Sequence, residues 1–209
     1  MKHVLRIVAL LSLAIAGVGA QTAPGGGRLT KDGIARASAI VDSVFVDRRL
    51  LNGTIDGGDW ASYLLARLGA GKIPDSLGIE VAVDSTHIEV RGRLQDLPLE
   101  TRALLGPIAS MVDSSTAVVA TVLLTRTGPE IARFYLRSIS VNGFPFPEFL
   151  LGSMMAKVGR QYPALTQSGR DLYVQVPADA TIVLTRGGVY VAAPAKAGSA
   201  RGSAPPSRR

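Results

Sequence analysis

The residue types that carry acid–base or nucleophilic chemistry are scarce in this chain. It contains no cysteine, which excludes thiol catalysis and every cysteine-based metal site. His3 lies in the N-terminal leader, so His87 is the one histidine of the remaining chain, and a zinc site would need more ligands of this kind. No Gly-x-Ser-x-Gly nucleophile elbow is present. We therefore predict no catalytic residue, no metal site and no cofactor, although a mechanism using carboxylates alone stays open.

Two groups of carboxylates are functional candidates by their spacing. Asp56 and Asp59 flank two glycines, which suggests a cation loop, but the ligand count of a calcium loop is missing. Turn and N-cap roles account for both residues, with Asp59 predicted to cap a short helix. Glu80, Asp84 and Glu89 are typical of the solvated face of a sheet.

The densest unusual feature is an aromatic segment between residues 134 and 149. The whole chain is only 5% aromatic, yet this stretch holds five aromatic residues, with two prolines alternating with phenylalanines from Phe144 to Pro147. Proline fixes the backbone and removes a donor, so the connector is stiff and extended. Two methionines follow, and flexible methionines suit surfaces that adapt to apolar partners. The predicted apolar lining of a ligand site is Phe134, Leu136, Phe144, Phe146, Phe149, Leu150, Met154 and Met155.

Two interpretations of this segment remain open at the level of sequence. Its side chains either fill the core at a junction between a strand and a helix, or they line an apolar cavity. The first would leave an interaction protein with a solid interior. The second would make the protein a binder of lipid or another apolar ligand.

The N-terminus predicts export. Lys2 and Arg6 precede an apolar run from Ile7 to Ala16, and Val18-Gly19-Ala20 ends it with small or compact residues, as in a secretory signal peptide. We divide the chain into a signal peptide (1–20), a flexible leader (21–29), a single α+β domain (30–193) and a disordered basic tail (194–209). The expected location is the periplasm, or the outside of the cell.

The net charge of +7 is concentrated at the two ends of the chain. The signal peptide holds two basic residues and the tail holds four, and neither holds an acid. The body between Gln21 and Ala193 is left at +1, which is too little for a broad nucleic-acid footprint. We predict no nucleic-acid partner. The tail is either a solvated end or a weak attachment to anionic membrane lipids.

Helical and strand periodicities position these features. Apolar residues at steps of three and four predict a helix from Gly33 to about Leu50, capped by Thr30, and a second helix carrying Trp60 and Leu64. A third helix is predicted from Leu97 to Leu105, and a fourth carries Phe149, Leu150, Met154, Val158 and Tyr162 along one stripe.

Alternating segments predict the strands. A hairpin with one wet face covers Ile79 to Leu94, and β-branched residues on both sides of Thr116 to Thr125 predict a strand covered on both faces. The strand from Ile131 to Asn142 shifts parity, which indicates a bulge near Ser138. A final hairpin turns at Gly187-Gly188. The predicted class is α+β, with a curved, mainly antiparallel sheet of six or seven strands and about four helices packed on one face.

Two passages carry a resemblance to a known group. Ser138 to Leu151 is similar to the passage of strand, Asn-Gly, apolar-proline and leucine helix in LmeA-like and YceB-like exported lipid-binding domains of the tubular lipid-binding superfamily. Val176 to Val191 resembles their closing hairpin. The resemblance implies a twisted sheet wrapped around a long helix, with lipid held by a generic apolar lining.

These observations predict an exported, non-enzymatic binder of a lipid or other apolar ligand, held in a groove between the sheet and its helices. The alternative is an envelope interaction protein with a filled core that docks a partner through a sheet edge or the tail.

Overall fold

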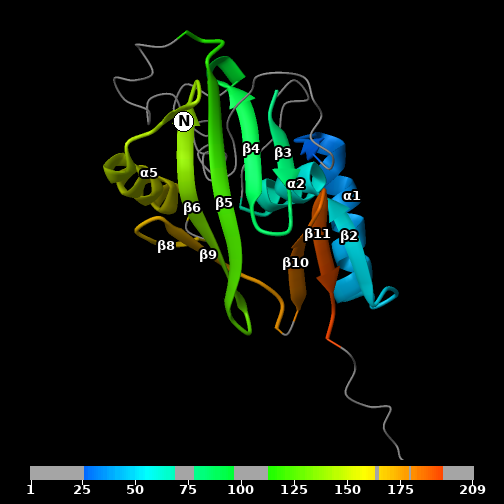
Figure 1. Ribbon diagram of the computed structural model, residues 1–209. Helices are drawn as coiled ribbons and strands as arrows, with labels where there is room; N and C mark the ends of the chain where they lie inside the picture. Colours follow the sequence, from blue (N-terminus) through cyan, green and yellow to red (C-terminus); the bar gives the residue numbers. More distant parts are fainter. Residues whose placement is uncertain (1–25, 69–77, 97–112, 163–164, 179, 195–209) are drawn as a thin grey trace, which may run out of the picture.

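The chain folds into an α+β domain with mainly antiparallel sheets, as predicted (Figure 1). The computed structural model describes residues 26–68, 78–96, 113–162, 165–178 and 180–194. The predicted signal peptide, the predicted third helix and all but the first residue of the predicted tail lie outside these ranges. No helix within them is long and apolar enough to cross a membrane.

The larger sheet has eight strands in the order β1-β3-β4-β5-β6-β9-β8, with β7 paired to β6. Every pairing in it is antiparallel. Its strands are β1 (Gly26–Arg28), β3 (Glu80–Val83), β4 (Ile88–Arg93), β5 (Ala117–Gly128), β6 (Ile131–Val141), β7 (Phe144–Pro145), β8 (Thr166–Ser168) and β9 (Asp171–Gln175).

The predicted single sheet of six or seven strands is wrong, because the C-terminal hairpin builds a second sheet. β10 (Thr181–Thr185) and β11 (Gly188–Ala192) form that hairpin, and β11 pairs on its other edge with β2 (Asn52–Asp56). The short β2 follows a loop and lacks clear alternation, so no periodicity in the sequence predicts it. The hairpin itself is confirmed, but the loop predicted at Gly187-Gly188 is wrong by one residue. Gly188 pairs with Thr185, so Arg186 and Gly187 form the loop.

One face of the larger sheet is apolar and the other is wet. Val81, Val90, Ala120 and Ile139 lie in register across four strands, and all are fully or almost fully buried. The opposite face carries charged and hydroxyl side chains, which confirms the wet face of the β3–β4 hairpin. The expectation that β5 is covered on both faces is wrong, because its second face, including Val119, is only partly buried.

Two irregularities in β6 agree with the sequence. Thr121 pairs with Ser138 and Val122 pairs with Leu136, so Arg137 is the extra residue of a β-bulge. After β6, Asn142 and Gly143 both have positive φ, at 55° and 83°, and turn the chain into β7.

The first helix is shorter than predicted. α1 (Lys31–Val41) begins where the Thr30 hydroxyl accepts from the Gly33 N–H at 3.0 Å, which confirms the cap. After Val41 the chain continues as a π-helical turn, η3 (Asp42–Val46), rather than as α-helix to Leu50.

The second helix is capped by the residue before its glycines. In α2 (Gly57–Arg67) the Asp56 carboxylate accepts from the Gly58 N–H at 2.9 Å, so the cap predicted at Asp59 is wrong. Asp59 instead forms a bidentate pair with Arg36 of α1, at 2.7 and 2.6 Å, which joins the two helices. A single short turn, η4 (Leu94–Asp96), follows β4.

The third helix, α5 (Glu148–Gln161), lies beside β8 and β9, away from α1 and α2 (Figure 1). The described residues thus hold three α-helices where the sequence predicted about four. The core is one cluster formed by the inward faces of both sheets and these helices.

The end of the predicted flexible leader is also corrected. Gly26–Arg28 forms β1, which pairs with β3 and crosses the start of α2. A Cβ on Gly58 would lie 2.4 Å from the Gly27 carbonyl carbon, so glycine is what permits this crossing.

Candidate functional site

The aromatic segment is divided between the core and the surface. Phe134, Leu136, Phe146, Met154 and Met155 are buried members of the hydrophobic core. The Phe134 ring packs against Trp60 of α2 with 5.9 Å between centroids. None of the five lines either of the cavities described below.

Of the other three predicted lining residues, Phe144 lies in β7 and Phe149 and Leu150 lie in the first turn of α5. Phe144 is 75% exposed and Phe149 is 82% exposed, while Leu150 is partly buried. The sequence placed Phe149 on the buried stripe of its helix, and this is wrong. The buried stripe runs through Leu151, Met155 and Val158, and Phe149 projects from the opposite side.

A groove lies between the two sheets, lined from β5 on one side and from β10 on the other. The two strands can be followed in the lower part of Figure 1. The inner part of the groove is a cavity of about 170 Å³ lined by Ser85, Leu124, Thr125, Arg126, Ala132, Val176, Ile182, Val183 and Leu184. A more open part of about 500 Å³ is lined by Arg126, Gly128, Pro129, Ala180, Thr181, Ile182 and Val183. The two parts share Arg126, Ile182 and Val183 and together form what we call the inter-sheet groove.

A difference in strand length creates one wall of the groove. β5 has 12 residues and β4 has six, and their pairing stops where Ile88 meets Val122. Beyond Val122 the edge of β5 that faced β4 has no strand beside it in the described chain. The other wall is β10, which is the edge strand of the smaller sheet.

The backbones of both walls direct polar groups towards the groove. The Leu94 N–H donates to the Thr116 carbonyl, so the backbone N–H and C=O groups of the even-numbered residues of β5 point towards β4. By the same alternation, the backbone groups of Leu124 and Arg126 point to that side of β5, where β4 has ended. The Ala193 N–H donates to the Leu51 carbonyl, so the odd-numbered residues of β11 direct their backbone hydrogen bonds to β2 and the even-numbered ones to β10. In β10, the backbone N–H and C=O groups of Ile182 and Leu184 therefore point away from β11 and towards the groove. No backbone hydrogen bond joins β5 to β10 among the described residues.

The groove carries one charged side chain among mostly apolar ones. Arg126 lines both parts, and its guanidinium donates to the carbonyl oxygens of Gly128 and Pro129 at the mouth. The deeper lining of Leu124, Ala132 and Leu184 is apolar. An elongated apolar guest with an anionic end would match this distribution.

His87 belongs to a turn and not to a catalytic relay. Its Nδ1 lies 3.0 Å from the Thr86 hydroxyl and 2.9 Å from the Asp84 carboxylate, so both neighbours share one ring nitrogen. A nucleophile–base–acid relay needs the two partners on different nitrogens. Burial acts to raise the pKa of Asp84, but hydrogen bonds from the Thr86 and His87 N–H groups and the Thr86 hydroxyl outweigh it and lower that pKa.

A second polar cluster stiffens the wet face of the larger sheet. Arg133 forms a bidentate pair with Asp171 at 2.7 and 3.1 Å, and this hydrogen-bonded pairing raises the pKa of Arg133. Arg133 and Arg170 both lie over the Tyr135 ring, at 5.3 and 5.0 Å from its centroid. Arg170 also donates to the Leu136 carbonyl at 2.9 Å, so these groups join β6 to the β8–β9 hairpin.

Leu124, Ile182 and Leu184 lie in strands that the sequence predicted, whereas Arg126, Gly128 and Pro129 lie just after the predicted strand, and the sequence analysis did not identify the groove as a site. The signal was the length of the strand predicted from Thr116 to Thr125, which exceeds what the preceding hairpin can pair. Within the described ranges, no group of three or more metal-ligating side chains is found. Comparisons with protein families, curated proteins and solved structures found no match for this chain.

Proposed function

We propose that this protein is a non-enzymatic binder of an elongated apolar ligand, such as a lipid acyl chain, held in the inter-sheet groove. The observation that carries the proposal is the apolar groove between β5 and β10, with Arg126 at its mouth. The inner part, at about 170 Å³, is smaller than the cavities of about 300–1,000 Å³ that enclose drug-sized ligands, which favours a linear chain over a bulky molecule there.

The energetic basis of such binding is burial of apolar surface. Each 100 Å² of ligand surface removed from water contributes about 2.5 kcal/mol. Arg126 can in addition pair with an anionic head group, because its charge lies where the groove opens. The ligand would then contact different residues from those the sequence predicted, since the predicted residues that are buried pack in the core.

The test is titration with a fluorescent long-chain fatty acid, supported by native mass spectrometry of the purified protein. Val183 is half exposed and lines both parts of the groove, so Val183→Trp should obstruct it without disturbing the core. We expect at least a roughly tenfold loss of affinity, the equivalent of about 1.4 kcal/mol.

Thr54→Trp is the matched control. Thr54 lies two strands away in the same cross-strand row, Val183–Tyr190–Thr54, and lines neither part of the groove. The Thr54→Trp variant should bind the fatty acid with the same affinity as the unmodified protein. Absence of any bound or exchangeable fatty acid would count against the proposal, as would equal losses in both variants.

A second candidate function is capture of an extended peptide. It is favoured by the edges of β10 and of β5 beyond Val122, which have no strand partner among the described residues, because a strand placed between them could hydrogen bond to both. This is the sheet-edge docking that the sequence left as the alternative.

A further inference from the structure

We propose that the end of the molecule at which the groove opens docks on the surface of a membrane that contains anionic lipids. The contact surface is an apolar rim, which we define as Val46, Leu50, Leu51 and Ile131. These are four of the seven large hydrophobic side chains that the structure leaves exposed, and Val46 and Leu51 are 70% and 77% exposed.

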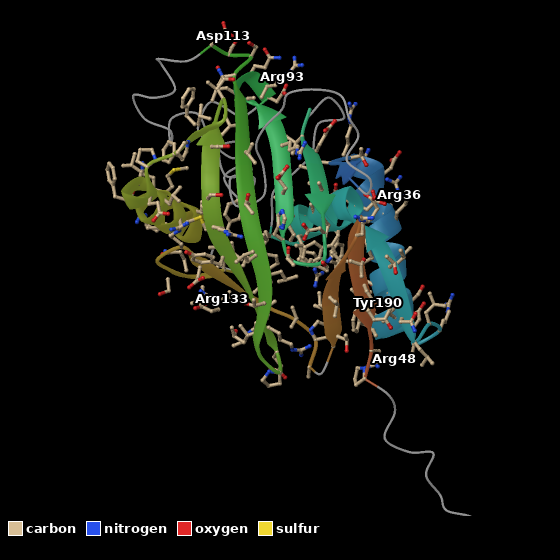
Figure 2. The ribbon with its side chains drawn as sticks, viewed as in Figure 1. Arg36, Arg48, Arg93, Asp113, Arg133 and Tyr190 are labelled. Atoms are coloured by element: carbon tan, nitrogen blue, oxygen red, sulfur yellow. The ribbon has the colours of Figure 1, made fainter. Side chains whose placement is uncertain are left out.

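Hydrogen bonds and strand register place one part of the rim. Ala192, the last residue of β11, pairs with Asn52 of β2 and with Thr181 of β10. The next residue, Ala193, donates its N–H to the Leu51 carbonyl at 3.1 Å. The Leu50 N–H donates a hydrogen bond to the Ser43 carbonyl, which holds Leu50 close to the π-helical turn. Figure 2 shows Arg48 at this lower end of the molecule, far from Arg93 and Asp113 at the upper end.

The cavity lining places the other part of the rim at the same end. Thr181, the first residue of β10, and Val183 line the open part of the groove together with Pro129 of the β5–β6 turn. Ile131 begins β6 directly after that turn. The rim therefore runs from the β5–β6 turn, past the mouth of the groove, to the loop before β2.

Charge identifies the partner as a bilayer with anionic lipids. Arg48, Arg49 and Arg126 lie along this end, against Asp47, which pairs with Arg49 at 3.2 Å, and Glu130. The sequence beyond Pro194 contains four basic residues and no acid, and Ala193, next to the last described residue, is hydrogen bonded to Leu51. Exposed apolar side chains next to a basic segment are the features that hold a protein at a lipid interface.

The opposite end provides a contrast within the same molecule. Phe144 and Phe149 are about as exposed as Leu51 and more exposed than Leu50. They follow the other end of β6, where Val141 pairs with Phe144. The segment around Phe144 and Phe149 has no run of basic residues comparable to the sequence after Pro194, and it contains the acidic Glu148. Docking should therefore depend on the rim and not on exposed apolar surface in general.

The experiment is co-sedimentation of the protein with vesicles of phosphatidylcholine alone or with added phosphatidylglycerol. Binding should require the anionic lipid. The double variant Leu50→Ser/Leu51→Ser should weaken partitioning roughly tenfold or more. Removal of the residues after Pro194 should weaken partitioning to the anionic vesicles by roughly fivefold for each basic residue lost.

The matched control is Phe144→Ser/Phe149→Ser, which should bind vesicles as the unmodified protein does. The inference is overturned by equal losses in the two double variants, by no loss in the rim variant, or by no binding to either vesicle. If the rim variant does not fold, Val46→Ser/Ile131→Ser is read by the same criteria. Val183→Trp, which obstructs the groove, should still sediment with vesicles, so this test is separate from that of the proposed function.

Discussion

At the scale of single residues, burial divides the side chains of the aromatic segment into two groups. Phe134 lies against Trp60 in the core, whereas Phe149 projects from α5 into solvent. The sequence could identify both as apolar and could not tell which would be enclosed. That distinction depends on where α2 and α5 cross the sheet, which no local pattern encodes.

This contrast makes a prediction about stability. Phe134→Leu should lower the free energy of unfolding by roughly 1–2 kcal/mol, because it removes ring contacts from a packed core. Phe149→Leu makes the same chemical change at an exposed site and should change it by less than about 0.5 kcal/mol. Urea denaturation measures both. Fatty-acid affinity should be the same in the two variants, and a selective loss in Phe134→Leu would restore the lining role that the sequence proposed.

At the scale of elements, the fold depends on close backbone crossings that only glycine allows. β1 crosses the N-terminus of α2 where Gly27 and Gly58 meet, and a Cβ on Gly58 would lie 2.6 Å from the Arg28 carbonyl oxygen. The atoms in the way are backbone, so they cannot move aside as a flexible side chain would. The crossing therefore holds the N-terminal strand against both the helix and β3.

Gly58→Ala should accordingly destabilise the protein by about 1–3 kcal/mol despite the higher helix propensity of alanine. Gly152→Ala in α5 is the control, because nothing lies within 4 Å of the Cβ it would add. That change should stabilise by about 0.5–1 kcal/mol, since alanine loses less backbone entropy than glycine. Thermal or urea unfolding of the two variants measures this difference, and a stable Gly58→Ala protein would show that the crossing is looser than described.

The elements that the sequence predicted correctly are those with a local signature. The β3–β4 hairpin, the bulge at Arg137 and the cap at Thr30 each follow from periodicity or from one side chain. β2 was missed because it is short and exists through its pairing with β11, which is more than 130 positions away in the chain. The end of α1 was missed for a similar reason, since apolar spacing continues through η3 although the hydrogen bonding changes.

At the scale of the whole molecule, the division into two sheets creates the candidate site. A single sheet with the C-terminal hairpin added to its edge would leave no groove. Because the hairpin pairs with β2 instead, two strand edges face each other across an apolar gap. The sequence predicted a groove between sheet and helices, and the described groove lies between the two sheets.

The two candidate functions differ in what they do to those edges, and hydrogen exchange distinguishes them. An acyl chain has no hydrogen-bonding groups along its length, so it should stabilise the whole fold by mass action. At a ligand concentration one hundred times its dissociation constant, the gain is about 2.7 kcal/mol, which for a domain of this size is a rise in melting temperature of roughly 5–10 °C. Hydrogen exchange at the amides of Ile182 and Leu184 should then slow no more than exchange at the neighbouring amides of β10.

A captured peptide would protect those two amides selectively, because its carbonyl groups would accept from the edge of β10. The amides of Val183 and Thr185 already point to β11 and provide the internal control. Hydrogen exchange is measured with and without a fatty acid, and separately with and without an extended apolar peptide. The fatty acid should slow exchange uniformly along β10. Alternate protection along β10, confined to the peptide, would instead assign the groove to strand capture and contradict the acyl-chain proposal.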